Sequence, residues 1–236
     1  FYAMPTIFVF LIALMVAFLQ NPKLNFNEKM HVAARGLADD NIVTMCLIFL
    51  VAGMFSGTVK AAVIMGTGWQ PRAAITGGLA VANAVAAVAG ESATSDLVTE
   101  LAFGSYNKLF APNRTKVDWL SADESNVDDY IADPLCGADA TVGLFRDMLG
   151  GIRFNQKPAN LKKMDTSMPV LFIAGEDDPV GAMGKGVKRS CAAFQKAGMQ
   201  DVTLKLYPGL RHEILNEKPM QQTVYADIHD WLSRYI

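Results

Sequence analysis

Short apolar runs alternate with amphipathic stretches from residue 62 to the end of the chain. The runs Ala62–Met65, Pro169–Ala174 and Val202–Tyr207 are each followed by Gly or Pro, which predicts three short buried strands. Residues 182–198 and 220–236 have apolar positions at helical spacing, so each predicts an amphipathic helix. Because strands alternate with helices, we expect a parallel sheet and a protein of the α/β class.

The long interval between the first two strands predicts a largely helical region. Its helices are expected over residues 73–89, 97–109 and 127–149, with loops between them. Ser121-Ala-Asp-Glu124 has the sequence of a capping box, in which the Ser side chain bonds forward and the Glu side chain reaches back. The Ala-rich stretch 73–89 predicts a helix that packs closely through small residues, and a membrane helix is the alternative.

The first quarter of the chain contains two long apolar runs in place of the short ones. Ala3–Leu19 carries no charge, and at ~1.5 Å per residue it nearly spans a ~30 Å hydrocarbon core. With the second apolar run, 42–59, it predicts an apolar helical hairpin that either crosses a membrane or packs on the sheet. A signal peptide is the other interpretation of the first run, although it lacks a basic start. We therefore expect an apolar helical segment over residues 1–60 and an α/β domain over 61–236.

Charge and cysteine content exclude several classes of protein. The net charge of −2 argues against a nucleic-acid partner, because no basic stripe exists to neutralise phosphates. The three cysteines are far apart, which suggests neither a disulfide framework nor a thiolate metal site. His212-Glu213 lacks the second His of a zinc protease motif, since Asn216 stands in that position. We expect no metal and no cofactor.

Asp178 and His212 are the candidate catalytic residues. Asp178 follows the second predicted strand, and His212 follows the third. Parallel strands end at the same edge of a sheet, so the two side chains should emerge as neighbours. An Asp that orients a His is the supporting half of a nucleophile, base and orienter arrangement. The alternatives are that Asp178 only caps a turn before Pro179 and that His212 is a polar surface residue.

The two candidate loops carry a resemblance to a known family. Gly175-Glu-Asp-Asp-Pro-Val-Gly181 and Tyr207-Pro-Gly-Leu-Arg-His-Glu-Ile-Leu-Asn-Glu217 resemble the end of the α/β-hydrolase fold. They are most similar to serine hydrolases of the monoacylglycerol lipase and lysophospholipase-like family, of the serine aminopeptidase type. The resemblance covers about residues 61–236. It implies that Asp178 is the triad acid and His212 the triad base, in the order Ser, Asp, His.

The resemblance also implies a helical cap over a substrate pocket, at about residues 69–165. Phe103, Tyr106 and Trp119 would suit a pocket for an acyl chain, and the equal alternative is that they form the core of the cap itself. The expected architecture is thus a partial α/β-hydrolase fold, a short parallel sheet with a helical cap, preceded by the apolar hairpin. The implied substrate is a lipid-like ester such as a monoacylglycerol or a lysophospholipid.

Residues 1–62 resemble something else. Asn21–Met30 and Gly36–Ala62 look like part of a sodium/proton antiporter, which suggests a fusion of two fragments near Lys60. Two spans cannot build the paired repeats that alternating access requires, and Ala3–Leu19 and 42–59 contain no ionisable residue. We therefore do not expect transport. A membrane-embedded antiporter fragment without catalysis is the alternative to the hydrolase interpretation.

No convincing nucleophile is present in the sequence. The elbow Gly-x-Ser-x-Gly lifts a serine clear of the sheet, and this motif is absent. Gly53-Met-Phe-Ser-Gly57 comes nearest, but Ser56 stands one place too late. We expect a serine ester hydrolase that is catalytically incomplete as it stands, membrane-associated with its hydrolase part cytoplasmic. A wholly cytoplasmic protein is the alternative, and a non-catalytic module that holds an acyl chain is a further one.

Overall fold

The computed structural model describes residues 60–235. The chain divides into two units, residues 1–59 and 60–236, and only the second is described below. The expected apolar hairpin, the antiporter-like stretch up to residue 59 and Ser56 lie outside the described residues.

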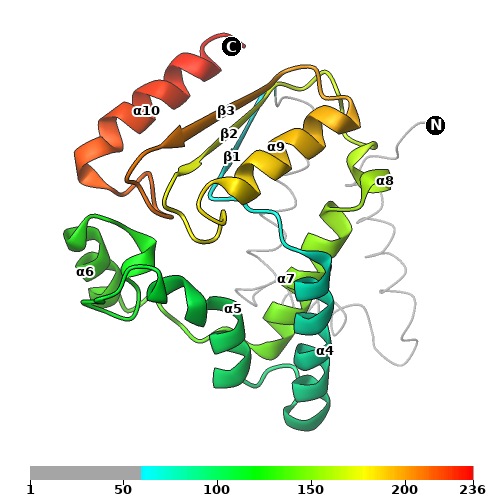
Figure 1. The fold of residues 1–236 in the computed structure, drawn as a ribbon, viewed down its shortest axis with the longest axis vertical. Helices are drawn as coiled ribbons and strands as arrows, with labels where there is room; N and C mark the ends of the chain where they lie inside the picture. The colour runs from blue at the N-terminus through cyan, green and yellow to red at the C-terminus, as the bar shows by residue number, and fades with distance from the viewer. Residues whose placement is uncertain (1–59, 236) are drawn as a thin grey trace, which may run out of the picture. The chain divides into compact units, whose positions relative to one another are not determined.

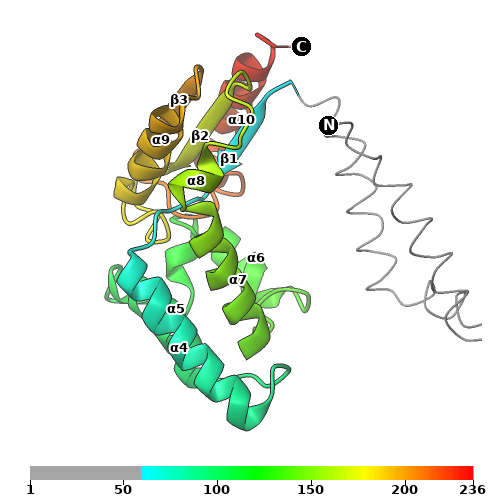
Figure 2. The same cartoon turned by 90° about the vertical axis from the view of Figure 1, so that its right-hand side faces the viewer.

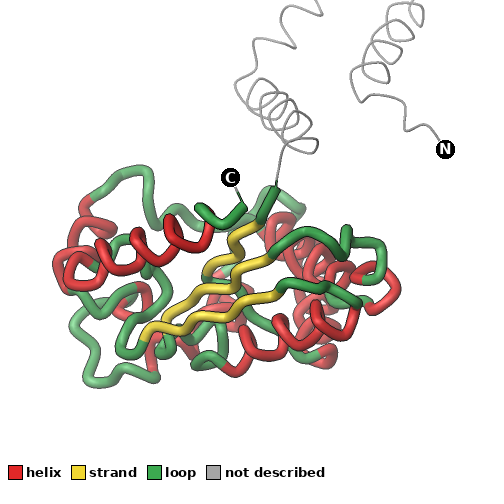
Figure 3. The backbone as a smooth tube through the Cα atoms, turned by 90° about the horizontal axis from the view of Figure 1, so that it is seen from above, coloured by secondary structure: helices red, strands yellow, loops and turns green. Residues whose placement is uncertain are grey.

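A three-stranded parallel sheet forms the centre of the described unit, as predicted. β1 (Ala62–Met65), β2 (Val170–Gly175) and β3 (Val202–Tyr207) lie side by side in the order β1-β2-β3 (Figure 3). Every residue of β2 is buried, as expected for a central parallel strand that is covered on both faces. Among the described residues, β1 pairs on one side only, with β2.

Two helices cover the two faces of this sheet. α10 (Lys218–Leu232) packs on one face, where Leu171 and Ile173 of β2 meet Val224 and Trp231. α9 (Lys185–Ala197) packs on the other face (Figure 1). Successive residues of a strand point to opposite faces, so β2 contributes to both apolar cores. On the α9 side the core contains Val170, Phe172, Ala174, Val187 and Cys191, with Phe194 packed against it.

A helical layer connects β1 to β2. Its elements are α4 (Arg72–Ala89), α5 (Asp96–Lys108), η1 (Asp118–Leu120), α6 (Glu124–Ala132), α7 (Val142–Asn155) and α8 (Pro158–Leu161). Most of it lies beyond the carboxyl ends of the strands, whereas its last helix, α8, lies beside α9 (Figures 1 and 2). α4 and α7 pack side by side, and Ala82, Val98, Val142 and Phe145 form their shared core with α5. We refer to this layer as the cap.

α4 is, among the described residues, the one helix whose length and composition would allow it to cross a membrane. Core helices of other proteins satisfy the same criteria. In the structure, Ile75, Leu79 and Ala82 of α4 are buried within the cap, whereas most of the helix is not buried.

Three local predictions need correction. The capping box at Ser121 is wrong, because the Ser121 hydroxyl accepts from the Asp123 N–H and Asp123 itself caps α6 through the Ser125 N–H. Ser121 therefore lies two residues before the N-cap of α6, which begins at Glu124. α9 begins at Lys185 rather than at residue 182, because Ala182 and Met183 have positive φ angles. The stretch 127–149 divides into α6 and α7, with the loop 133–141 between them.

The fold predicts that central core positions of β2 dominate stability. Ile173→Ala should lower the free energy of unfolding by about 2–5 kcal/mol, because this fully buried side chain would leave a cavity between the sheet and α10. Val88→Ala is the matched control, since Val88 is 91% exposed and its truncation should change stability by less than about 0.5 kcal/mol. Urea unfolding of both variants measures the difference, and equal shifts would contradict this assignment of the core.

Candidate active site

Asp178 lies in the turn that follows β2, with its side chain fully buried. The turn is fixed by two backbone bonds, from the Glu176 N–H to the carbonyl of Tyr207 at the end of β3 and from the Asp177 N–H to the carbonyl of Leu210 in the loop after it. One carboxylate oxygen of Asp178, Oδ1, accepts the Val180 N–H at 2.8 Å. The other, Oδ2, lies 3.1 Å from Nδ1 of His212. The carboxylate therefore has a partner on each oxygen, as a buried charge requires.

His212 lies in the loop after β3, opposite Asp178. Its side chain is 30% exposed, while that of Asp178 has no exposure. An ionised carboxylate can only accept a hydrogen bond, so the imidazole must donate from Nδ1. Nε2 then carries the free lone pair and has no hydrogen-bond partner within residues 60–235. An imidazole oriented in this way is suited to act as a general base.

Gly66 brings the end of β1 against the same histidine. It has a φ of +60°, and a Cβ atom at this position would lie 3.1 Å from Cε1 of His212. Only glycine combines that backbone angle with such a close approach. The ends of all three strands thus meet at the Asp178–His212 pair. The sequence predicts Gly66 as the end of a strand, and a Gly at that point is the one local signal of the close approach.

Aromatic side chains of the cap extend from His212 into the helical layer. The ring of Trp119 lies 5.4 Å from the imidazole and 5.3 Å from the ring of Tyr106. Phe103 lies 6.0 Å from Tyr106 and 6.1 Å from Trp119. Burial, and then the charge of Asp178, raise the pKa of the Tyr106 hydroxyl. The structure therefore places the three predicted pocket residues together, on the side of the cap that faces the candidate base.

A small cavity in the cap adjoins two of these rings. Its volume is about 160 Å³, and its lining is mostly apolar and comes from α4, α5 and α7. Phe103 and Tyr106 line the cavity, whereas Trp119 lies nearer to His212. Phe103 also packs against the cap core. Both interpretations of the aromatic residues, pocket wall and cap core, thus have support from the geometry of Phe103.

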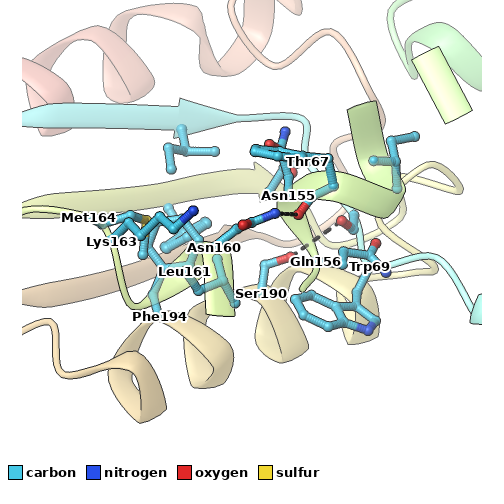
Figure 4. Close-up of a pocket in the computed structure, with 15 residues that line it drawn as sticks. Thr67, Trp69, Asn155, Gln156, Asn160, Leu161, Lys163, Met164, Ser190 and Phe194 are labelled. Carbon is cyan, nitrogen blue, oxygen red and sulfur yellow. Dashed lines mark hydrogen bonds between the residues drawn. The ribbon is translucent and has the colours of Figure 1, made fainter. Parts of the chain in front are cut away.

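A second, larger cavity of about 520 Å³ lies apart from the Asp178–His212 pair, on the α9 side of the sheet (Figure 4). Ile64 of β1, Phe172 of β2 and Phe194 of α9 line it, together with Trp69 and residues around α8. The Ser190 hydroxyl at its wall donates to the carbonyl of Gly68 at 3.3 Å. Neither Asp178 nor His212 contributes to this cavity.

The described residues supply no nucleophile beside His212. Across residues 60–235, no serine hydroxyl forms a hydrogen bond with its imidazole. The weak candidate Ser56 lies outside this part of the chain. No group of three His, Cys, Asp or Glu residues that could hold a metal ion occurs in the described part. The catalytic roles of Asp178 and His212 therefore stay predictions that rest on their mutual geometry.

Comparison with known proteins gives consistent matches. The family model described as serine aminopeptidase, S33 (Hydrolase_4), matches residues 47–219. A monoacylglycerol lipase from Mycolicibacterium smegmatis is 31% identical over 121 residues, which cover 50% of this chain and 40% of the lipase. The expected α/β-hydrolase family and its monoacylglycerol lipase-like character are confirmed.

Solved structures confirm the fold. A thermostable carboxyl esterase from Bacillus coagulans superposes with a TM-score of 0.68 at 24% identity, over 75% of this chain and 57% of the esterase. A monoacylglycerol lipase from Paleococcus ferrophilus gives a TM-score of 0.53 at 16% identity, over 78% of this chain and 62% of the lipase. The chain thus spans less than two thirds of the length of each of these relatives.

The family match bears on the N-terminal prediction as well. It begins at residue 47, inside the stretch 36–62 that resembles an antiporter. None of the three relatives named above is a transporter. The fusion with an antiporter fragment stays a prediction about residues outside the described part.

The site geometry predicts that Asp178 sets the tautomer of His212. In Asp178→Asn the amide can donate to Nδ1, so the imidazole proton should move to Nε2 and the base should lose its free lone pair. Nitrogen NMR of the chain labelled with ¹⁵N-histidine would show this exchange of the two ring nitrogens. Asp177→Asn is the control, since only the backbone N–H of Asp177 is tied to the histidine loop. An unchanged spectrum in Asp178→Asn would contradict the orienting role.

Proposed function

We propose that this chain, which belongs to the serine aminopeptidase S33 family, carries the acid and base half of a serine hydrolase for lipid-like carboxylic esters. The observation that supports it most is the contact between Asp178 and His212, made where the carboxyl ends of parallel strands meet. That edge of an open α/β sheet is where ligands generally bind. The order of the two residues, Asp before His, agrees with the order in this fold class.

The mechanism follows from the roles of the two side chains. A serine hydroxyl attacks the ester carbonyl while Nε2 of His212 removes its proton. The imidazolium then protonates the leaving alcohol, and water repeats the sequence to release the acid. Asp178 keeps the Nδ1 proton in place and stabilises the positive charge that forms on the ring. Because Asp178 is fully buried, solvent does not compete for its carboxylate.

The substrate class is supported by the cap. Trp119, Tyr106 and Phe103 give an apolar path from His212 into the cap, and the small cavity continues beside them. An acyl chain would bury apolar surface along this path, at ~25 cal/mol per Å². A monoacylglycerol or a lysophospholipid presents such a chain together with a compact ester head.

We propose further that the chain is catalytically incomplete because it lacks a nucleophile. No Gly-x-Ser-x-Gly motif occurs in the sequence, and Ser56 is only a weak substitute. A serine supplied by another chain would complete the machinery. Membrane association through residues 3–19 and 42–59, with the hydrolase part cytoplasmic, is proposed with it, and a wholly cytoplasmic location is the alternative.

Labelling with a fluorophosphonate, which reacts with activated serines, tests the missing nucleophile. We expect no labelled serine within residues 60–235 of the full chain, because none bonds to His212. The heat-denatured chain is the control for non-specific reaction. Labelling of a cap serine such as Ser105, lost in His212→Ala, would contradict the proposal. Labelling of Ser56 that depends on His212 would instead show a complete triad within this chain.

Ligand binding tests the substrate class without a nucleophile. A monoalkyl glycerol ether, which cannot be hydrolysed, should bind the full chain and change the fluorescence of Trp119. Phe103→Ala should weaken binding about tenfold, the factor expected for ~1.4 kcal/mol of lost apolar contact. Leu135→Ala is the control, because Leu135 is 90% exposed. Equal affinities for all three proteins would exclude the aromatic path as the acyl site.

A further inference from the structure

The peptide groups on both sides of His212 are held by hydrogen bonds. The Arg211 N–H donates to Oε1 of Glu217 at 2.7 Å. The Glu213 N–H donates to the carbonyl of Leu120, in η1 of the cap, at 2.8 Å. The backbone that carries the imidazole is therefore fixed once within its own loop and once from the cap.

The carboxylate of Glu217 joins the same loop to the cap. Its second oxygen, Oε2, accepts the Ala122 N–H at 3.2 Å, and the residue is only 3% exposed. Burial raises the pKa of the Glu217 carboxyl, while the two N–H donors and the charge of Arg211 act in the opposite direction. A buried carboxylate is costly unless it is hydrogen-bonded, so this side chain favours the one geometry in which both donors reach it.

The guanidinium of Arg211 forms a second connection to the same segment of the cap. It donates from Nη1 to the carbonyls of Asp118 and Ser121. It also stacks over the ring of Phe110, with Cζ 3.9 Å from the ring centre. The segment held in this way, residues 118–122, is called the cap loop below. It includes Trp119, the aromatic residue beside His212.

We propose that Glu217 and Arg211 are positioning residues that couple the cap loop to the loop of His212, so that the imidazole and this part of the cap move as one body. The proposal rests on the proposed function only in that His212 is taken as the base. Neither residue is expected to touch the substrate. Across the described residues, α4 and α7 share no hydrogen bond with residues 208–217.

Hydrogen exchange of the full chain tests the coupling directly. In Glu217→Gln one acceptor oxygen is lost, so amide exchange should accelerate about tenfold or more both in the cap loop and in residues 209–213. Glu176→Gln is the matched control, because the Glu176 side chain is exposed and only its backbone N–H is tied to the end of β3. Its exchange in the two segments should stay within about twofold of the wild-type chain.

Arg211→Lys provides a second variant in case Glu217→Gln does not fold. It keeps the charge but loses the planar guanidinium, which stacks over Phe110 and donates from Nη1 to two carbonyls, so exchange should again accelerate in both segments together. In either variant the ¹⁵N-histidine spectrum should show altered His212 ring signals, while those of the exposed His229 stay unchanged. A general loss of stability would not change the ring signals of His212 while those of His229 stay the same.

Failure of the coupling can be told apart from failure of the proposed function. Neither hydrogen exchange nor the ¹⁵N-histidine spectrum requires a nucleophile or an ester. Acceleration in only one of the two segments, or unchanged His212 signals in a folded variant, would overturn the coupling. Joint acceleration with altered His212 signals would support it, even where fluorophosphonate labelling argues against hydrolysis.

Discussion

The burial of the Asp178 carboxylate is the constraint on which the candidate site depends. A charge without exposed surface needs a hydrogen bond at each oxygen, and here the Val180 N–H and the His212 imidazole supply them. The first bond comes from the turn after β2 and the second from the loop after β3. The energetic need of one side chain thus fixes the relative position of two loops that are more than thirty residues apart in the sequence. The imidazole, left with one exposed nitrogen, is oriented as a consequence.

The strands and the Asp178–His212 contact were predictable because their signals are local or follow from strand order. Apolar runs that end at Gly or Pro located the three strands to within a residue of their observed bounds. Parallel strands share a carboxyl edge, and this alone made Asp178 and His212 neighbours. The confirmed α/β-hydrolase fold was predicted on the same residues.

Other features could not be predicted because they depend on tertiary contacts. The sequence Ser121-Ala-Asp-Glu124 offers two capping residues, Ser121 and Asp123, and only the hydrogen bonds of the folded chain show that Asp123 caps α6. The approach of Gly66 to His212 depends on strand pairing rather than on its neighbours in sequence. The role of Glu217 was equally hidden, since none of its neighbours in the sequence predicts that this carboxylate is buried. Only burial against the cap reveals its two backbone partners.

The placement of the cap within the chain has a consequence for folding. β2 and β3 are joined through a single helix, whereas the whole cap separates β1 from β2. Closing the longer connection costs roughly 1 kcal/mol more in chain entropy, and non-local pairings form late in folding. The unit β2-α9-β3 can therefore assemble first, with Asp178 and His212 already in contact. β1, which is held on one edge within the described residues, would join last and bring Gly66 to the imidazole as the final step.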